Sequence, residues 1–314
     1  MHGFREDLVG LDITADCIIA TRVRPVGDGR FEVRNAGWVS YPAGDSAARV
    51  ARHIRRLWRR SGLANYTVCS CLRSRALMLR YFQYPGLAAE ELASALRLQA
   101  EETLVMSGDE IVIDWHLNRH AAAGETADSP GGAEGVLVAV PKAEVDRHLA
   151  MLEQAGLVPV VVDVGCMALC NLFLALRADA CAAGAVCLVN LATHTADVAV
   201  LLKQGWIYPH VVFAQQAAWE SSVEYLGANI ADVLKYYRFK LRQEPVARLI
   251  LTGHLPSGDG FAGQLGERVG LPVEIWDPLS GLELGTRRVR RLLERHPGAG
   301  PLLATSLGLA MRRS

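Results

Sequence analysis

The chain has 314 residues, and its 33 basic and 33 acidic side chains give a formal net charge of zero at pH 7. A hydrophobic fraction of 51% and a charged fraction of 21% are typical of a globular protein, and the length leaves room for two lobes. The composition gives no signal for nucleic acid or for a membrane surface, and no apolar run reaches the ~18 residues of a membrane helix.

One predicted layout occurs twice: three short strands joined by tight turns and followed by a helix. In the first copy the strands are expected at 8–14, 17–24 and 31–41, and the helix at about 45–60. In the second copy they are expected at 186–192, 195–203 and 206–213, and the helix at about 215–242. The runs are rich in Val, Leu, Ile and aromatic residues, which favour strands. The amino-acid sequences of the two copies differ, so only the order of strands and helix is repeated. This repeat predicts two related α/β lobes.

The section between the copies contains further strands and helices. Strands are expected at 66–72, 76–84, 111–117, 136–141 and 158–164, and helices at 88–105, 142–155 and 165–177. The last of these helices would link the two lobes. Residues 120–135 are mostly Ala, Gly, Ser and Pro, which predicts a mobile loop.

The seven cysteines lie mostly within apolar runs. Cys69 and Cys71 are two apart on an expected strand, and Cys166 and Cys170 are four apart on an expected helix. A zinc site needs spacings such as Cys-x-x-Cys with nearby His, and these are missing from the sequence. We therefore expect buried, reduced thiols and no metal, which indicates the cytoplasm.

Three motifs resemble the nucleotide-binding strands of the actin-like superfamily. Gly10-Leu11-Asp12-Ile13 resembles the first phosphate strand, Val189-Asn190-Leu191-Ala192 the second, and Leu249 to Gly253 the adenosine strand. The resemblance implies an α/β protein with the actin-like (ribonuclease H-like) fold of two lobes.

The middle of the chain narrows this resemblance to one family. Its motifs are Tyr84-Pro85-Gly86 with Glu90-Glu91-Leu92, Val138 to Lys142, and Leu152 to Pro159. They resemble PilM, the actin-like protein of type IV pilus assembly, which shares an inserted subdomain called 1C with the cell-division protein FtsA. The implied parts are a first lobe at 1–84, a 1C-like subdomain at 85–163, a second lobe (2A with a reduced 2B) at 164–297, and a C-terminal helix at 298–314 that returns to the first lobe.

The resemblance also implies a role. PilM is a cytoplasmic scaffold, peripheral at the inner membrane, that holds the N-terminal tail of the membrane protein PilN in a groove beside subdomain 1C. The implied partners are a PilN-like tail and the pilus motor ATPase, with membrane contact through partners and no nucleic acid. We place the tail site near Leu104, Asp114 and Trp115, because helix 88–105 carries more than one apolar stripe and strand 111–117 alternates.

Departures from the motifs predict a degenerate nucleotide cleft. Phosphate strands need small residues, so that backbone N–H groups can reach the phosphates, and a carboxylate to position the waters of the metal. The remnant cleft is expected at Asp12, Thr14, Asn190, Ala192, Thr195 and Gly253. Thr14 stands where Gly or Ser is usual, Asn190 replaces Asp, and Asp197 would repel a phosphate. Phe213 also runs almost directly into the helix at 219–242, so most of subdomain 2B, which supplies much of the adenine pocket, is expected to be missing.

We therefore expect no cofactor and no catalytic residue, and three functions remain open. The first is a PilM-like scaffold without nucleotide. The second is a working ATPase of the same family that binds ATP with Mg²⁺, and the third is a sugar or acetate kinase of the superfamily. The cytoplasmic domain of the secretion protein GspL is a related alternative. Asp12 could also be an ordinary strand-end carboxylate that accepts hydrogen bonds from backbone donors.

Two arginine-rich runs have no assigned role. Arg55, Arg56, Arg59 and Arg60 end one expected helix, where cations are favoured, and a second run spans Arg287 to Arg295. Solvated helix ends are the simplest interpretation, and anionic lipid headgroups are the alternative for the first run.

Overall fold

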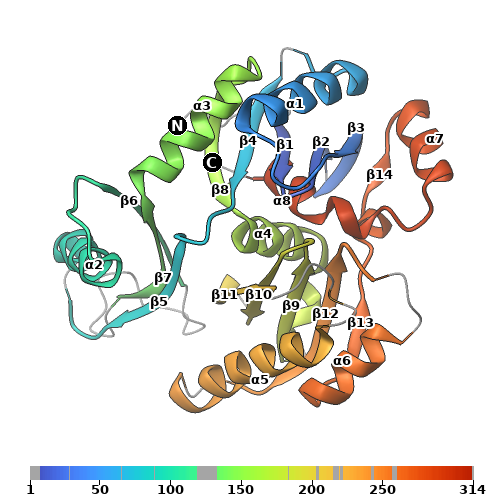
Figure 1. The fold of residues 1–314 in the computed structure, drawn as a ribbon. Helices are drawn as coiled ribbons and strands as arrows, with labels where there is room; N and C mark the ends of the chain where they lie inside the picture. The colour runs from blue at the N-terminus through green and yellow to red at the C-terminus, as the bar shows by residue number, and fades with distance from the viewer. Residues whose placement is uncertain are drawn as a thin grey trace.

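The sheet of the first lobe is built on a three-strand meander, as Figure 1 shows for this computed structural model. The structure describes residues 8–27, 29–64, 66–87, 89–118, 133–182, 184–202, 205–214, 219, 222–241, 244–256 and 260–312. The strands β1 (Leu8–Ile13), β2 (Cys17–Gly27) and β3 (Arg30–Ser40) are antiparallel. Parallel strands β4 (Thr67–Leu72), β8 (Pro159–Val164) and β14 (Glu283–Leu284) extend the sheet to the order β14-β3-β2-β1-β4-β8. Helix α1 (Ala47–Ser61) covers one face with Val50, Ile54 and Leu57.

The second lobe repeats this arrangement. Its sheet has the order β11-β10-β9-β12-β13, from β9 (Ala185–Leu191), β10 (Thr195–Leu201), β11 (Ile207–Phe213), β12 (Val246–Gly253) and β13 (Val273–Ile275). Alternate residues of its strands face opposite layers. Val189 and Leu191 pack toward α5 (Val223–Lys240) and α6 (Phe261–Val269), whereas Val186 and Leu188 pack toward α4 (Gly165–Arg177). The two lobes predicted from the repeated layout are thus both present.

A third, smaller sheet lies beside the lobes. Its order is β5-β7-β6, from β5 (Met78–Tyr84), β6 (Ile111–Leu117) and β7 (Ala133–Pro141), and helix α2 (Ala89–Leu104) packs on one face. Most of the loop predicted at 120–135 lies outside the described residues. The other face contacts the second lobe, where Trp206 Nε1 donates to Glu134 Oε1 at 2.7 Å and the rings of Tyr81 and Trp206 lie 5.6 Å apart.

Strand pairing moves the expected boundaries between the parts. β5 was expected in the first lobe, but it hydrogen-bonds to β7 in the small sheet. β8 was expected in the inserted subdomain and β14 in the second lobe, but β8 pairs with β4, and β14 with β3, in the sheet of the first lobe. Helix α3 (Lys142–Gln154) likewise packs with Leu152 in the core under α1. The inserted part is therefore closer to 78–141 than to 85–163.

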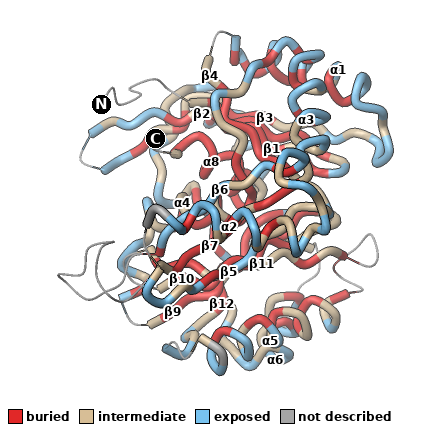
Figure 2. Tube along the Cα trace, turned by 90° about the vertical axis from the view of Figure 1, so that its left-hand side faces the viewer, coloured by how far each residue is buried: buried red, intermediate tan, exposed pale blue. Residues whose placement is uncertain are grey.

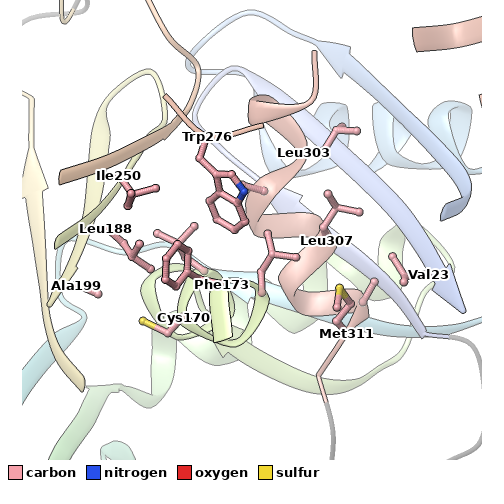
Figure 3. Close-up of a cluster of buried hydrophobic side chains, with 14 of the residues drawn as sticks. Val23, Cys170, Phe173, Leu188, Ala199, Ile250, Trp276, Leu303, Leu307 and Met311 are labelled. Atoms are coloured by element: carbon pink, nitrogen blue, oxygen red, sulfur yellow. The ribbon is translucent and has the colours of Figure 1, made fainter. Parts of the chain in front are cut away.

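One hydrophobic core joins the two lobes. Figure 3 shows Phe173 of α4 and Leu307 of α8 (Ala304–Ala310) between Val23 of the first lobe and Ile250 of the second. Helix α8 approaches its neighbours closely because Gly10 and Gly308 have no side chain. A Cβ at Gly10 would lie 1.9 Å from Ser306 O, and one at Gly308 would lie 2.0 Å from Ala168 O. The relative position of the lobes is therefore fixed by packing as well as by polar contacts.

The seven cysteines are all free and buried, as predicted. Burial raises the pKa of the Cys17, Cys69 and Cys187 thiols to about 12, so these groups stay protonated at neutral pH. Within the described part of the chain, no helix is long and apolar enough to cross a membrane.

The connection between β11 and α5 is short. β11 ends at Phe213 and α5 begins at Val223, so residues 214–222 join them. Such a length is too small for a separate subdomain with its own core; the reduction of subdomain 2B stays a prediction. The start of the helix predicted at 215–242 falls on residues 215–218, 220 and 221, which lie outside the described part.

Candidate functional site

The β1–β2 and β9–β10 hairpins face each other across the cleft between the lobes. Thr14 closes the first turn, where its backbone N–H donates to Cys17 O at 2.8 Å and its hydroxyl accepts from Cys17 N at 3.1 Å. Ala192 closes the second turn, with its N–H donating to Thr195 O at 2.8 Å. Thr193 Oγ1 donates to Asp16 Oδ1 at 2.8 Å, so the two turns touch directly.

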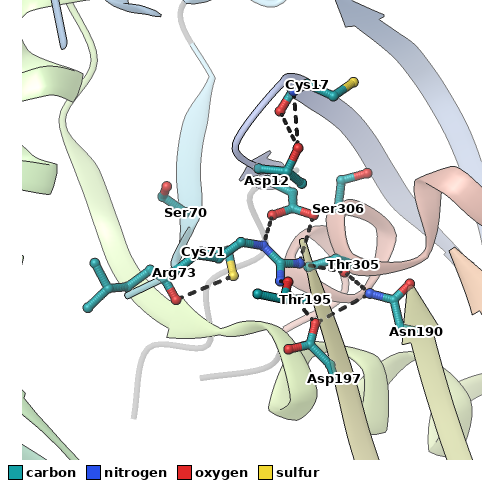
Figure 4. Close-up of polar contacts among 12 residues, drawn as sticks. Asp12, Cys17, Ser70, Cys71, Arg73, Asn190, Thr195, Asp197, Thr305 and Ser306 are labelled. Carbon is teal, nitrogen blue, oxygen red and sulfur yellow. Dashed lines mark hydrogen bonds and ion pairs between the residues drawn. The ribbon is translucent and has the colours of Figure 1, made fainter. Parts of the chain in front are cut away.

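Arg73 lies at the centre of the cleft, immediately after β4 (Figure 4). Its Nε donates to Asp12 Oδ1 at 2.8 Å and its Nη2 to Asp12 Oδ2 at 3.1 Å, which is a bidentate pair with the first lobe. Its Nη1 donates to Asp197 Oδ2 at 3.1 Å, which is a pair with the second lobe. A single guanidinium therefore bridges carboxylates from both lobes.

Neutral side chains complete this network. Asn190 Nδ2 donates to Asp197 Oδ2 at 3.3 Å and to Thr305 Oγ1 at 3.0 Å. The hydroxyls of Thr305 and Thr195 each accept from the guanidinium at 3.4 Å. Arg73 and its two carboxylate partners are almost wholly buried, with side-chain exposures of 14%, 3% (Asp12) and 4% (Asp197). We call these six residues the Arg73 network.

The Arg73 network contains one cation, the Arg73 guanidinium, and two carboxylates, Asp12 and Asp197. The two carboxylates raise the pKa of Arg73 well above its ordinary value and outweigh the desolvation of the guanidinium, so the group stays charged. Among the described residues, no three His, Cys, Asp or Glu side chains are grouped in a way that would hold a metal ion. A fixed internal cation thus lies between the two acids at this point.

The space left around the hairpins is small. Asp12, Thr14, Asn190, Ala192 and His254, together with other residues, line a cavity of about 10 Å³. That is about the space one water molecule needs, whereas small-molecule ligand sites are typically ~300–1,000 Å³. Trp219, which is 3% exposed, packs behind the second turn and donates from Nε1 to Ala192 O at 2.6 Å.

A second cavity of about 340 Å³ lies on the side of Arg73, Arg75 and His148. It shares only Thr14 and Ala192 with the small one. The residue that follows the expected adenosine strand, His254, lines the small cavity and not this one. The predicted cleft residues are thus divided between the two cavities, because Thr195 lines the larger one, and Asp12 and Asn190 line the small one.

The structure brings the six predicted cleft residues together, and each of them contacts other residues of the protein. Asp12 is paired with a side chain rather than with backbone donors, so the simple strand-end interpretation is wrong for it. Gly253 has φ +97°, and a Cβ there would lie 2.2 Å from Leu191 O, so this glycine is needed for the packing of β12 against β9. Thr14 and Ala192 form turns, and Asn190 and Thr195 belong to the Arg73 network.

Sequence reasoning missed Arg73, Thr305 and Trp219, and it took Asp197 only as a repulsive charge. A signal for Arg73 was available. It follows a strand that pairs in parallel with β1, and the carboxyl ends of parallel neighbours meet at one edge of a sheet, where ligands usually bind. Thr305 and Trp219 carried no comparable signal, because Thr305 lies on helix α8 and Trp219 in the connection after β11, and neither follows a parallel neighbour of β1 or β9.

The residues predicted for a partner site are not all in one place. Trp115, which is 36% exposed, lines an open cavity of about 360 Å³ between α2 and β6, together with Arg97, Leu98 and Ile113. Asp114 is exposed on the alternate face of β6, and its Oδ1 accepts from Trp115 N at 2.8 Å. Leu104 packs in the core of the small sheet, so its place in a docking surface is not supported.

Comparison with known proteins identifies related sequences and folds. A family model described as type IV pilus assembly protein PilM matches residues 10–211. The chain resembles a solved structure of a PilM-PilN type IV pilus biogenesis complex, with a TM-score of 0.82, 20% identity and 98% of each chain covered. No curated protein matches the chain.

Two more distant structures have the same fold. One is a Bacteroides thetaiotaomicron protein with an actin-like ATPase fold and unknown function, with a TM-score of 0.52, 11% identity and coverage of 92% of this chain and 96% of that one. The other is the ethanolamine utilization protein EutJ from Carboxydothermus hydrogenoformans, with a TM-score of 0.51, 11% identity and coverage of 96% and 88%. These likenesses confirm the actin-like α/β fold predicted from the sequence.

Proposed function

Because the chain belongs to the PilM family of type IV pilus assembly proteins, we propose that it is a scaffold of a type IV pilus assembly complex that works without a nucleotide. In this proposal the protein acts at the cytoplasmic face of the inner membrane. Its partner there is the N-terminal tail of a PilN-like membrane protein, in keeping with the solved complex that its fold resembles. The pilus motor ATPase stays a predicted partner.

The Arg73 network is the observation that carries the nucleotide-free part of this proposal. In an actin-like cleft, a nucleotide brings phosphates and Mg²⁺ between the two hairpins. Here a guanidinium already neutralises Asp12 and Asp197, and the space between the hairpins is about 10 Å³. ATP would have to separate two buried charge pairs and displace side chains of both lobes, which costs several kcal/mol before any contact is gained.

Titration of the purified protein with ATP and Mg²⁺ should give no binding heat at micromolar concentrations. The reason is that the Arg73 guanidinium already pairs with both cleft carboxylates and that the space beside the hairpins is about 10 Å³. Isothermal calorimetry measures this directly, with ADP and Mg²⁺ as the second titrant. A micromolar dissociation constant, about −8 kcal/mol, would instead favour the alternative of a working PilM-like ATPase.

The edge of the small sheet is the surface that best fits a peptide tail. β6 pairs only with β7 in the order β5-β7-β6, so its outer edge has no strand partner among the described residues. Trp115 and Leu117 are 36% and 40% exposed on one face of this strand, and Val112 is 41% exposed on the other. Leu98 of α2, which is 57% exposed, lines the open cavity with Trp115. An added strand would supply main-chain hydrogen bonds, while its alternate side chains would enter the cavity at Leu98 and Trp115.

Replacing Trp115 with alanine should weaken capture of a PilN-like tail by about tenfold or more, because large buried aromatic anchors often contribute 2 kcal/mol or more to an interface. Asp114→Arg should weaken it as well if the charge beside the edge orients the tail. The measurement is a pull-down with the first two dozen or so residues of the partner. Phe239→Ala, an exposed aromatic (70%) on α5, is the matched control and should bind as wild type does. Wild-type capture by folded Trp115→Ala protein would show that the tail binds elsewhere.

A further inference from the structure

Two helices of the first lobe carry an extreme share of the basic charge. α1 contains six arginines and no carboxylate, and α7 (Arg287–Arg295) contains five arginines and a single carboxylate, Glu294. Their combined formal charge is +10, although the whole chain is neutral. The rest of the chain therefore carries −10, so charge is strongly separated within the molecule.

The fold brings the C-terminal end of α1 next to the N-terminal part of α7, at the outer edge of the sheet (Figure 1). A Cβ on Gly62, just after α1, would lie 3.6 Å from Arg288 Nη1. Strand β3 holds both helices, since Asn35 Nδ2 donates to Ser61 O at 2.7 Å and Thr286 Oγ1 donates to Arg34 O at 3.1 Å. Two runs that are more than 220 residues apart in the sequence thus form one surface.

We call this surface the arginine face and define it by Arg56, Arg59, Arg60, Arg287, Arg288 and Arg291. All six side chains are exposed, and Figure 2 shows the exposed outer side of α1. Within the described part of the chain, none of the six makes an ion pair. Several cations on other helices are paired instead: Lys142 with Asp146, Arg147 with Glu144 and Lys235 with Asp232.

Helix stability accounts for the arginines at the end of α1 but not for those at the start of α7. Arg59 and Arg60 lie in the last turn of α1, where the helix dipole favours cations. Arg287 and Arg288 lie in the first turn of α7, where the dipole disfavours them, and that turn holds no acidic residue. Like charges are also brought together where the helices meet. An arrangement that costs stability in the free protein indicates an anionic partner.

We propose that the arginine face binds directly to the anionic phospholipids of the membrane on which the protein assembles, a step that rests on the proposed function at the inner membrane. α1 and α7 themselves carry no exposed large hydrophobic residue, whereas Val158, which is 82% exposed, borders the surface in a cavity that it shares with Arg55 and Arg59. The two helices lack both the exposed aromatic platforms that single-stranded nucleic acids stack on and the apolar anchors typical of a protein interface. Phosphate headgroups need neither, and guanidinium groups bind them bidentately.

Charge separation gives this contact an orientation. The cytoplasmic leaflet is negative, so it attracts the arginine face and repels the rest of the chain, whose formal charge is −10. The same face would point to the membrane in every copy. The scaffold would thus be oriented before it binds the tail of its partner, and lipid and tail would use different elements, α1 with α7 and α2 with β6.

Vesicle flotation of the full chain tests the proposal. Vesicles of phosphatidylcholine containing about one-third phosphatidylglycerol should carry the protein at low ionic strength, vesicles of phosphatidylcholine alone should not, and ~1 M salt should release it because the Debye length falls to ~3 Å. The test variant carries Arg56→Gln, Arg60→Gln, Arg287→Gln and Arg291→Gln. Each arginine near an anionic surface contributes roughly a fivefold gain in partitioning, so the variant should lose more than a hundredfold.

A matched variant controls for net charge. It carries Arg147→Gln, Lys235→Gln, Arg238→Gln and Arg268→Gln, all exposed and outside α1, α7 and the cavity at Trp115, and it should float as wild type does. The proposal is overturned if wild type ignores the anionic vesicles, or if the two variants lose binding equally. The arginine-face variant should still capture the PilN-like tail, so a failure of lipid binding and a failure of the proposed function give different results. Thermal melting shows whether each variant is folded.

Discussion

Replacing Arg73 with alanine should lower the free energy of unfolding by about 3–5 kcal/mol, the loss typical when one partner of a buried ion pair is removed. The variant leaves Asp12 and Asp197 buried and facing each other without a cation, with side-chain exposures of 3% and 4%. The two carboxylates belong to different lobes, so their repulsion also acts to separate the lobes. Urea unfolding followed by tryptophan fluorescence measures the change.

Two further variants separate the charge effect from other causes. Arg75→Ala removes a nearby exposed arginine that stacks 5.0 Å from the ring centre of Phe213, and it should cost less than about 1 kcal/mol. The triple variant Arg73→Met, Asp12→Asn and Asp197→Asn removes all three charges and should recover most of the stability lost in Arg73→Ala. An Arg73→Ala protein as stable as wild type would mean that the network contributes no stability.

Acidification from pH 7 to pH 4 should lower the free energy of unfolding by about 3 kcal/mol through His148 alone. Burial lowers the pKa of this histidine from 6.5 to about 4, and the residue is only 9% exposed. The unfolded chain takes up the proton below about pH 6.5, whereas the folded protein takes it up only near pH 4. Stability that is present above pH 6.5 is therefore lost as the pH falls to 4, and the loss levels off below that value.

The comparison variant His148→Gln cannot titrate but can still hydrogen-bond to Ser70, whose Oγ lies 2.9 Å from His148 Nε2. It should fall less steeply between pH 6.5 and 4 than wild type, and His254→Gln, an exposed histidine, should fall as steeply as wild type. Burial also lowers the pKa of His210, so part of the slope should remain in the His148 variant. Urea midpoints across this range give the slopes, and identical slopes in wild type and His148→Gln would contradict the assignment.

The parts of the fold that the sequence could predict are those set by local pattern. Strands that alternate or run apolar between Gly turns, such as β1 and β9, were located within a residue or two, and so was helix α1 after the first meander. The helix after the second meander was predicted from 215, whereas α5 begins at Val223. β14 has two residues and exists only because β3 offers an edge for it. A strand so short has no pattern of its own, and its pairing depends on a contact between positions more than 240 residues apart.

In the candidate site, too, residues set by local pattern could be predicted, whereas contacts between distant segments could not. Asp12 and Asn190 could be placed in the cleft because each lies on a recognisable strand of a repeated unit. Their actual partners could not, since Arg73 and Thr305 reach them from a third and a fourth segment. Motif comparison therefore located residues of the cleft, whereas only the three-dimensional arrangement shows which side chains contact them.

The position of α8 has a consequence for the order in which the protein folds. The sheet of the first lobe starts at residue 8, yet it receives β14 at 283–284 and the close contact of α8 at 304–310 only after the whole second lobe. During synthesis, the apolar surface around Val23 and Phe173 stays uncovered until Leu307 arrives. Contacts so distant in sequence form slowly, and exposed apolar surface favours aggregation in the meantime. We therefore expect that the first lobe, although it is made first, is completed last, and that it does not fold as an isolated fragment.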